Sequence, residues 1–456
     1  MTLPKIGWLR QITSERFQHL GREFLWIGSG QAVATLGALV GVRLLTSVLS
    51  PDIYGELALG MTLATLVSQV VLGPLSGAAL RFFSLASEVG ELVVFLTALR
   101  RLLARATGVV LLVAGGVCLS LLLSRQSNWL WLGAAAFGFA LFSGYNSALD
   151  GMQNAARQRP IVAWHQALAS WVRFLAAAGL VLWLGANSAI AMLGYVLATL
   201  LVLLSQLWFF RCTLLHTNGL SSGGTVSPQH WETQMLAYAW PFAAWGIFTW
   251  SQIVSDRWAL QMFASTREVG LYAVLYQLGY YPITILTGLM VQLVTPVFFQ
   301  RAGDASDPSR MQQVHTLNWR LTMVALLLTG IVTLLAFALH RLVFRWLVAP
   351  DYRAVSRLLP GMMLAGGLFA TGQFAVISLL SGAETRSLIV PKVITAVVGV
   401  LLNMLGAAWW GILGVVGAGV ITSAFYLLWI LHLVRTRRNQ LVSMGSALSS
   451  SSHNAL

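Results

Sequence analysis

Charged residues are scarce in this sequence. Only 9% of its 456 residues are Asp, Glu, Lys or Arg, and 57% are hydrophobic, whereas soluble domains carry about 25% charged residues. This scarcity excludes a water-soluble fold, because so few charges cannot cover its surface. Apolar runs of about 20 residues recur along the chain, and each can cross a hydrocarbon core roughly 30 Å thick. The composition therefore predicts an all-α polytopic membrane protein.

Cysteine is nearly absent. Cys118 lies within an apolar run and Cys212 at the end of one, and two cysteines so placed indicate neither a disulfide framework nor a metal site. The sequence also shows no catalytic constellation and no cofactor motif. Residues 1–23 contain basic residues but no continuous apolar core, so we do not expect them to be a cleaved signal peptide.

Acidic residues are half as frequent as basic ones, 14 against 28, and the net charge is +14. This excess does not indicate nucleic-acid binding, because the cations lie in short loops between apolar runs. With the N-terminus in the cytoplasm, nineteen cations fall on the cytoplasmic side and seven on the opposite side. By the positive-inside rule, both termini are therefore expected to be cytoplasmic.

Twelve apolar segments are predicted to span the membrane. They cover residues 24–49, 54–80, 106–123, 129–149, 161–184, 189–210, 236–262, 270–299, 319–339, 358–382, 391–409 and 411–434. The longest loop, 211–235, contains LSSGGTVSP and is expected to be a flexible cytoplasmic linker. It separates an N-terminal six-helix lobe, 1–210, from a C-terminal one, 236–434. The Ser-rich residues 435–456 are predicted to form a disordered cytoplasmic tail.

The two halves resemble each other at one place. SPDIYGELA at 50–58 and STREVGLYA at 265–273 share Ser, Gly and Ala at matching positions, and both enter the second helix of a half. Two halves of six spans have the same orientation, as in transporters built from parallel repeats, where the halves enclose a central cavity. Glycines in LGALVG and GILGVVGAG suit close helix packing.

Three arginines in or near the spans are candidate substrate contacts. Arg173 lies mid-span, where a lipid-facing arginine costs about 2.5–3.5 kcal/mol, so it should face protein or a water-filled cavity. It is either a structural arginine or a cation that meets an anionic substrate. Arg43 and Arg257 precede the two matching segments at nearly equal distances. They either form a phosphate clamp, which suits the planar guanidinium, or snorkel to the interface.

Other polar and aromatic side chains are weaker candidates. Contacts to sugars or headgroups are expected from Arg81, Gln31, Asn146, Trp171, Trp250 and Gln277, and ion coupling from Asp256, His165 and Asp150. Amides hydrogen-bond sugars and indoles stack on them, so the same role is open to further residues of these types: Gln69, Gln166, Gln252, Gln373, Trp164 and Trp245. Interfacial anchoring, helix–helix hydrogen bonds and a satisfied buried histidine are the alternatives. Asp256 is expected to neutralise an arginine other than Arg257, because adjacent helical side chains diverge.

Several loose motifs occur in order along residues 20–435. They are Leu49-Ser50-Pro51-Asp52-Ile53-Tyr54-Gly55, the GAALR ending at Arg81, Asp256-Arg257 followed by Val269-Gly270-Leu271-Tyr272, and a Gly-rich final helix pair. In these motifs the chain resembles the polysaccharide-unit flippases (Wzx type) of the multidrug/oligosaccharidyl-lipid/polysaccharide exporter superfamily.

The resemblance implies two six-helix lobes around a cationic cavity, with Arg43 and Arg257 on it. It also implies movement of undecaprenyl-pyrophosphate-linked oligosaccharide from the cytoplasmic to the periplasmic leaflet of a bacterial inner membrane, for O-antigen, capsule or exopolysaccharide synthesis. The partners it implies are the lipid-linked oligosaccharide and membrane lipids, with a polysaccharide polymerase and a chain-length regulator as further candidates.

Two other functions stay open. A cation-coupled multidrug antiporter of the same superfamily would favour a buried carboxylate, but no acidic residue lies at the centre of a predicted span. A membrane polymerase or ligase would need a large outer loop with reactive groups, and the outer loops are short. Neither the glycan nor a coupling ion follows from the residues.

Overall fold

The computed structural model describes the backbone of residues 7–215, 227–303, 308–381 and 385–453. The side chains of residues 1–27, 214–226, 296, 304–308, 382–386 and 440–456 lie outside its described part, and with them Lys5, Arg10, Arg16, Arg22 and Arg386 of the charge count. Throughout the described part, every regular element is helical. Nine of the described helices are long and apolar enough to cross a membrane. The predicted all-α polytopic fold is confirmed.

The chain divides into two compact units. The first contains residues 1–49 and 60–250, and the second contains 50–59 and 251–456. Helix α2 (Pro51–Val67) therefore begins in the second unit and ends in the first. The units differ from the predicted lobes at two places, since residues 50–59 belong to the second unit and 236–250 to the first.

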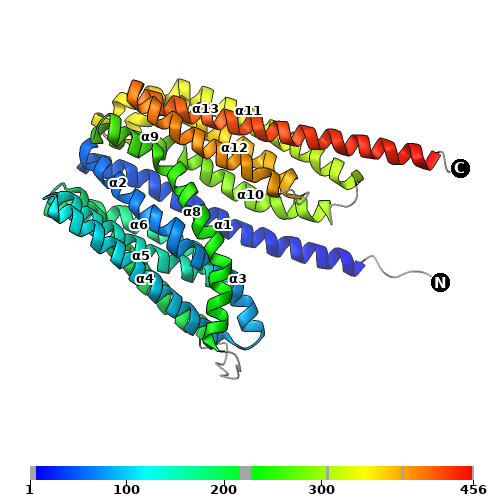
Figure 1. Cartoon of the computed structure of the whole chain (residues 1–456), viewed down its shortest axis with the longest axis horizontal. Helices are drawn as coiled ribbons and strands as arrows, with labels where there is room; N and C mark the ends of the chain where they lie inside the picture. Colours follow the sequence, from blue (N-terminus) through cyan, green and yellow to red (C-terminus); the bar gives the residue numbers. More distant parts are fainter. Residues whose placement is uncertain (1–6, 216–226, 304–307, 382–384, 454–456) are drawn as a thin grey trace. The chain divides into compact units, whose positions relative to one another are not determined.

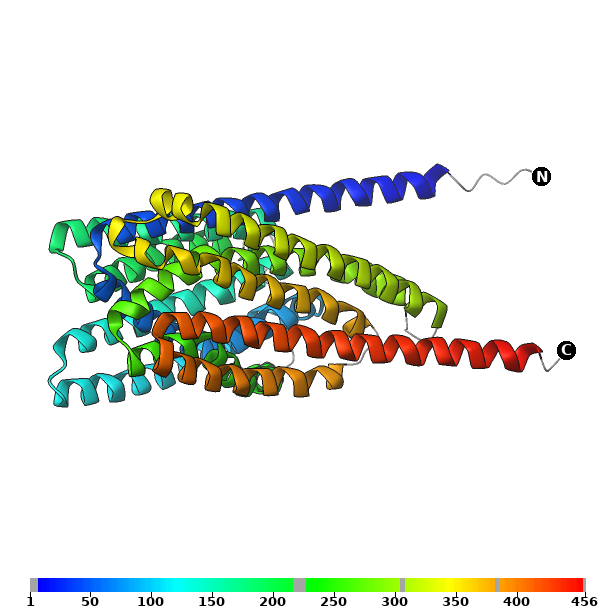
Figure 2. The same ribbon diagram turned by 90° about the horizontal axis from the view of Figure 1, so that it is seen from above.

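Long helices run alongside one another in each unit (Figures 1 and 2). The first unit has α1 (Gly7–Val48), the π-helical turn η1 (Ser68–Leu72), α3 (Gly73–Glu88), α4 (Leu92–Leu123), α5 (Ser127–Ala155), α6 (Arg159–Leu184), α7 (Ser188–Phe210), the π-helical turn η2 (Arg211–Leu215) and most of α8 (Pro228–Phe263). The second has α9 (Thr266–Gly279), α10 (Tyr281–Ala302), α11 (Pro308–Leu347), the 3-10 helix η3 (Pro350–Leu358), α12 (Leu359–Ser381), the 3-10 helix η4 (Thr385–Leu388) and α13 (Ile389–His453).

All twelve predicted segments fall on helices, but the helices are divided differently. The segment 270–299 is split between α9 and α10, whereas 391–409 and 411–434 both lie in α13. Gly411, with φ 55° and ψ −134°, interrupts α13 between those two segments, a conformation that glycine adopts at little steric cost. Helices α5 and α8 are not among the nine helices that are long and apolar enough to cross a membrane. A count of twelve spans therefore requires α5, α8 and both parts of α13.

Helices extend into the predicted linker and through the predicted tail. Helix η2 enters the predicted linker 211–235 from one side and α8 from the other, and residues 216–226 lie outside the described part. Helix α13 continues through the predicted disordered tail to His453. Extending a helix that already exists needs no new nucleation, which is the costly step of helix formation.

Small residues let the helices of the first unit approach closely. A β-carbon on Gly37 would overlap the Trp171 indole, and one on Gly41 would collide with the Phe174 ring, so α1 packs along α6. The Ser170 hydroxyl also donates to the carbonyl oxygen of Ala34 at 2.7 Å. The predicted packing role of the LGALVG glycines is confirmed.

Glycines have the same role in the second unit. A β-carbon on Gly55 would collide with the carbonyl oxygen of Thr266, and one on Gly270 with that of Pro51. These are the glycines shared by the two matching segments. Within α13, Gly414 lies against the Gly406 backbone, which confirms the packing role for this glycine of GILGVVGAG but not for Gly417, where an added β-carbon would meet nothing within 4 Å.

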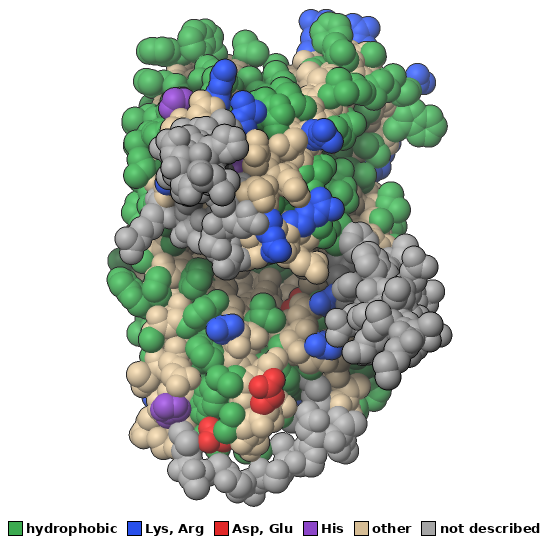
Figure 3. All heavy atoms as spheres, turned by 90° about the vertical axis from the view of Figure 1, so that its right-hand side faces the viewer, with side chains coloured by type: hydrophobic (Ala, Val, Ile, Leu, Met, Phe, Trp, Pro, Cys, Tyr) green, Lys and Arg blue, Asp and Glu red, His purple; other side chains and the backbone are tan. Residues whose placement is uncertain are grey.

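The outer surfaces of the helices are apolar. Large side chains such as Leu112, Leu123, Trp183 and Phe337 are more than 70% exposed, which in water would be costly patches but suits contact with lipid. Figure 3 shows hydrophobic side chains over the helices and Lys and Arg among them at the helix ends that face the viewer.

Candidate functional site

Arg173 lies near the middle of α6 and is half-buried. Its guanidinium carbon is 4.9 Å from the centre of the Phe174 ring and 5.3 Å from that of Tyr195 on α7. Its buried Nε has no hydrogen-bond partner in the described part of the chain, and no carboxylate among those residues forms an ion pair with it. The charge is therefore held by two aromatic faces, an attractive contact that leaves the terminal N–H donors available for an anion.

The aromatic faces beside Arg173 are fixed by packing. Phe174 is 3% exposed and Tyr195 is 5% exposed, and their rings meet edge to face with centres 5.9 Å apart. Phe174 also fills the space left by Gly41 of α1. Buried rings in such contacts have few alternative rotamers, so the position of the guanidinium is preorganised.

The other two candidate arginines of the first unit lie at its surface. Arg43 on α1 and Arg81 on α3 are exposed, which suits interfacial anchoring as well as substrate contact. Gln31 on α1 is half-buried, as is Gln277 on α9 of the second unit.

Two of the predicted ion-coupling residues are joined in one polar cluster between α5, α6 and α7. Asp150 accepts hydrogen bonds from the amides of Gln166 at 3.1 Å and Gln206. His165 is 2% exposed, and its two ring nitrogens lie 2.8 Å from the carbonyl oxygen of Ile161 and 3.2 Å from the Ser205 hydroxyl. Both side chains have hydrogen-bond partners within the fold, as expected for a satisfied buried histidine.

The predicted indole and amide contacts also have partners inside the first unit. Trp171 Nε1 donates to the carbonyl oxygen of Val33 at 3.0 Å, and Trp250 Nε1 to that of Thr62 at 2.8 Å. Asn146 Nδ2 donates to the carbonyl oxygen of Thr199 at 3.3 Å, while its buried Oδ1 has no partner among the described residues. These bonds favour a helix-packing role for the two tryptophans.

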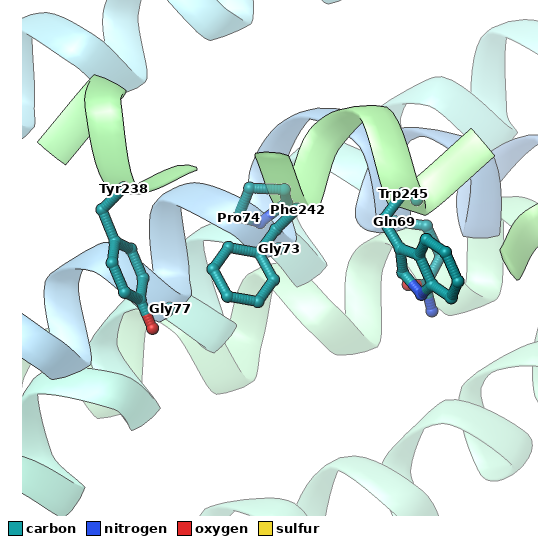
Figure 4. A pocket seen from close by; sticks show the side chains of 8 residues that line it. Gln69, Gly73, Pro74, Gly77, Tyr238, Phe242 and Trp245 are labelled. Atoms are coloured by element: carbon teal, nitrogen blue, oxygen red, sulfur yellow. The ribbon is translucent and has the colours of Figure 1, made fainter. Parts of the chain in front are cut away.

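A cavity of about 310 Å³ opens in the first unit between η1, α3 and α8. Tyr238, Phe242 and Trp245 line one side of it, since spacings of four and three residues put them on one face of α8 (Figure 4). Gln69 lies at the Trp245 end, and Gly73, Pro74 and Gly77 follow along the cavity. We call this the aromatic cavity. Its row of aromatic faces with one amide suits a sugar ring, which has apolar C–H faces and polar edges.

The π-helical turn η1 positions Gln69. A β-carbon on Gly246 would collide with the Gln69 carbonyl oxygen, so α8 approaches this turn backbone to backbone. The Gly73 N–H donates to the carbonyl oxygen of Ser68, which closes the turn. Such turns within helices are frequent at functional sites, because they redirect side chains and carbonyl groups.

Arg257 of the second unit is an ion-pair partner of Asp256. Its Nη1 lies 3.4 Å from Asp256 Oδ1, and both side chains are mostly buried, at 13% and 9% exposed. The expectation that Asp256 would pair with a different arginine was wrong. Divergent side-chain directions do not separate these two, because the long Arg257 side chain turns back to the Ile253 carbonyl oxygen at 3.1 Å and passes the carboxylate.

Tyrosines of α9 complete this cluster. The Tyr272 hydroxyl donates to Asp256 Oδ2 at 2.7 Å, and the Arg257 guanidinium carbon lies 4.7 Å from the centre of the Tyr276 ring. Tyr276 stacks on Tyr280 with ring centres 5.0 Å apart. Arg257 thus has both an acidic and an aromatic partner, unlike Arg173.

Several residues of these sites were missed in the sequence. Tyr195, Tyr238, Phe242 and Tyr276 were not singled out, and Tyr272 was named only as part of a motif, although two of the groups carry a helical spacing signal. Tyr272, Tyr276 and Tyr280 recur every four residues, and Tyr238, Phe242 and Trp245 share one helix face. Aromatic residues at such spacing are common in helix cores, so the pattern alone indicates no site.

Comparison with known proteins identifies the family. A family model described as "Polysaccharide biosynthesis protein" matches residues 20–302. No curated protein sequence matches the chain.

Solved structures share the fold at low sequence identity. The lipid II flippase MurJ in an inward closed conformation has a TM-score of 0.65 at 12% identity, over 90% of this chain and 87% of that one. An inward-facing multidrug resistance MATE family transporter of the MOP superfamily has a TM-score of 0.61 at 12% identity, over 91% and 96%. A MOP superfamily transporter from Pyrococcus furiosus has a TM-score of 0.55 at 11% identity, over 92% of this chain and 94% of that one. The chain belongs to the polysaccharide biosynthesis protein family and has the fold of MOP superfamily transporters and flippases.

Proposed function

We propose that this chain is a flippase for oligosaccharide units linked to undecaprenyl pyrophosphate. It moves them from the cytoplasmic to the periplasmic leaflet of a bacterial inner membrane, for O-antigen, capsule or exopolysaccharide assembly, with both termini in the cytoplasm. Membership of the polysaccharide biosynthesis protein family supports this proposal. So does the fold shared with a lipid II flippase.

The observation that carries the proposal is the environment of Arg173. A guanidinium near the middle of a membrane helix, held only by the faces of Phe174 and Tyr195 among the described residues, is costly without an anion. A pyrophosphate supplies that anion, and its oxygens match the planar fork of N–H donors. Arg43 and Arg257 are further candidate cations of the translocation path, although Arg257 would first have to exchange Asp256 for the substrate.

The aromatic cavity supplies the second part of the substrate site. Tyr238, Phe242 and Trp245 would stack on sugar rings while the Gln69 amide bonds a hydroxyl. Sugars vary between glycans but all have apolar faces, so stacking tolerates different units. The polysaccharide polymerase and the chain-length regulator would receive the unit on the periplasmic side.

The carboxylates do not favour drug antiport. A cationic drug needs a buried carboxylate that is open to it, but Asp256 accepts hydrogen bonds from Tyr272 and Arg257. Asp150 accepts them from two glutamine amides. Flipping forms and breaks no covalent bond, so the proposal requires no catalytic group.

Reconstitution in vesicles tests the function directly. An undecaprenyl-pyrophosphate-linked oligosaccharide with a fluorescent sugar is placed in both leaflets, and a membrane-impermeant quencher reports the accessible fraction. With the protein, we expect the protected half to become accessible much faster than in empty vesicles. Equal rates, together with export of a cationic drug by the same vesicles, would replace the flippase by the antiporter. In cells, deletion should strand the unit in the cytoplasmic leaflet.

A further inference from the structure

A second cavity lies in the second unit, between the first turns of α11 and the C-terminal part of α13. Its volume is about 300 Å³, and His315, Trp319, Val434, Arg435 and Arg438 line it. It shares no residue with the aromatic cavity or with the cluster of Asp256, Arg257, Tyr272 and Tyr276. The two helices contribute different chemistry, since α11 provides an imidazole and an indole and α13 provides two guanidinium groups.

His315 is a buried side chain with one ring nitrogen that no described residue hydrogen-bonds. It is 3% exposed, and its Nδ1 has no hydrogen-bond partner within the described residues. Leaving such an atom unsatisfied is unfavourable, and a bound group that hydrogen-bonds it removes that penalty. Because His315 lines the cavity, a ligand there is the natural partner.

The arginines define the charge of that ligand. Arg435 and Arg438 lie three residues apart, hence on one face of α13, and both are exposed at the cavity. Two guanidinium groups and an imidazole converge there, while the cavity lining contains no carboxylate. This donor set suits a tetrahedral oxyanion, because arginine binds phosphate oxygens through paired N–H groups.

We propose that this cavity binds the phosphate headgroup of an anionic phospholipid. The site lies between two membrane helices at the end of α13 that the charge distribution assigns to the cytoplasmic face. Basic pockets between helices on that face attract the headgroups of anionic lipids. Trp319, which is 37% exposed, and Val434 provide the apolar and interfacial surface that a lipid needs and a soluble phosphate does not. The bound headgroup joins α11 to α13 and supplies the partner of His315.

Lipid titration followed by native mass spectrometry tests the site. The purified full-length protein is titrated in detergent with phosphatidylglycerol and, separately, with phosphatidylcholine of the same chain length. We expect one phosphatidylglycerol to bind in preference to phosphatidylcholine. Arg435→Gln and Arg438→Gln should each weaken that binding about fivefold. Arg437→Gln, in the same helical turn but outside the cavity lining, removes the same charge and should leave binding unchanged.

Two results would overturn the proposal. Equal weakening by all three arginine variants would show diffuse attraction to the basic helix end rather than a built site. Displacement of phosphatidylglycerol by millimolar inorganic phosphate, with no preference over phosphatidylcholine, would assign the cavity to a soluble anion instead.

A substitution of His315 separates binding from folding. His315→Phe removes the unpartnered polar atom and keeps an aromatic ring, so lipid-free protein should unfold at the same temperature or a higher one. Added phosphatidylglycerol should raise the unfolding temperature of the wild type, and it should raise that of this variant much less. A variant that is less stable without lipid and still gains fully from phosphatidylglycerol would assign His315 a packing role only and contradict the proposal.

Discussion

Gly55 and Gly270 occupy matching positions in the two halves of the sequence, and each packs against the backbone beside the other. A β-carbon on Gly55 would collide with the carbonyl oxygen of Thr266, and one on Gly270 with that of Pro51. Pro51 and Thr266 themselves match at the same offset. The contact between α2 and α9 is therefore reciprocal, and the shared glycines are a packing requirement of both helices.

Alanine at either glycine should destabilise the second unit. The obstacle is a backbone carbonyl, which cannot rotate away as a side chain can, so α2 and α9 must separate. We expect Gly55→Ala and Gly270→Ala each to cost about 1–3 kcal/mol, seen as a lower unfolding temperature of the purified protein. Gly179→Ala on α6, where nothing lies within 4 Å of the added carbon, is the matched control. Equal stability of all three variants would disprove the close contact.

Arg173→Ala should abolish translocation while the protein still inserts. The substitution removes the mid-membrane charge and its N–H donors but leaves the Phe174 and Tyr195 rings in place. The vesicle assay should give the rate of empty vesicles, and cells should make no polymer. Arg100→Gln, an exposed cation near the start of α4, should retain normal rates. Arg173→Lys keeps the charge but not the planar fork, so we expect partial activity. Normal transport by Arg173→Ala would reject the role of this cation.

The Arg257–Asp256 pair should respond to substitution as a unit. Arg257→Gln removes the cationic partner of the buried Asp256 carboxylate. Removal of one member of a buried ion pair costs about 3–5 kcal/mol. The double variant Asp256→Asn/Arg257→Gln removes both charges and should recover much of that stability. Thermal unfolding of the two single variants and the double variant gives the coupling energy. Additive losses would show that the pair contributes no mutual stabilisation.

The same single and double variants separate a structural role from a transport role for Arg257. If Arg257 also holds the substrate, the double variant should regain stability without regaining translocation. Recovery of both would leave Arg257 a purely structural residue and remove it from the proposed site.

Rings of the aromatic cavity should affect substrate affinity more than stability. Tyr238→Ala, Phe242→Ala and Trp245→Ala each remove one stacking surface, worth about 1 kcal/mol, and should raise the KM for the lipid-linked oligosaccharide about fivefold. Trp240→Ala, on the same helix but 68% exposed and outside the cavity lining, should not. If an undecaprenyl pyrophosphate without sugars shows the same rise in KM, the rings contact the lipid or the phosphates instead.

The helices could be predicted from the sequence because backbone groups in lipid must be paired, and continuous apolar runs of about 20 residues achieve this as helices. The same reasoning predicted that Arg173 faces protein or a water-filled cavity, since the penalty for facing lipid depends on its depth in an apolar run. The repeat at Gly55 and Gly270 was visible as sequence identity, although its meaning as a contact was not. Helix divisions inside the runs were less predictable, because a kink at Gly411 or a π-helical turn at Gln69 scarcely changes the hydrophobic pattern.

The composition and order of the residues by themselves determined that this chain is a helical membrane protein with a charge in the middle of an apolar run. Only the tertiary structure decided which partners each polar group has. It paired Asp256 with its own neighbour, gave Arg173 two rings and no carboxylate within the described residues, and placed Gln69 in one cavity with Trp245 and His315 in another with Arg435. Such contacts depend on helix crossings and rotamers, which are set by packing between segments far apart in the chain and leave no local signal in the sequence.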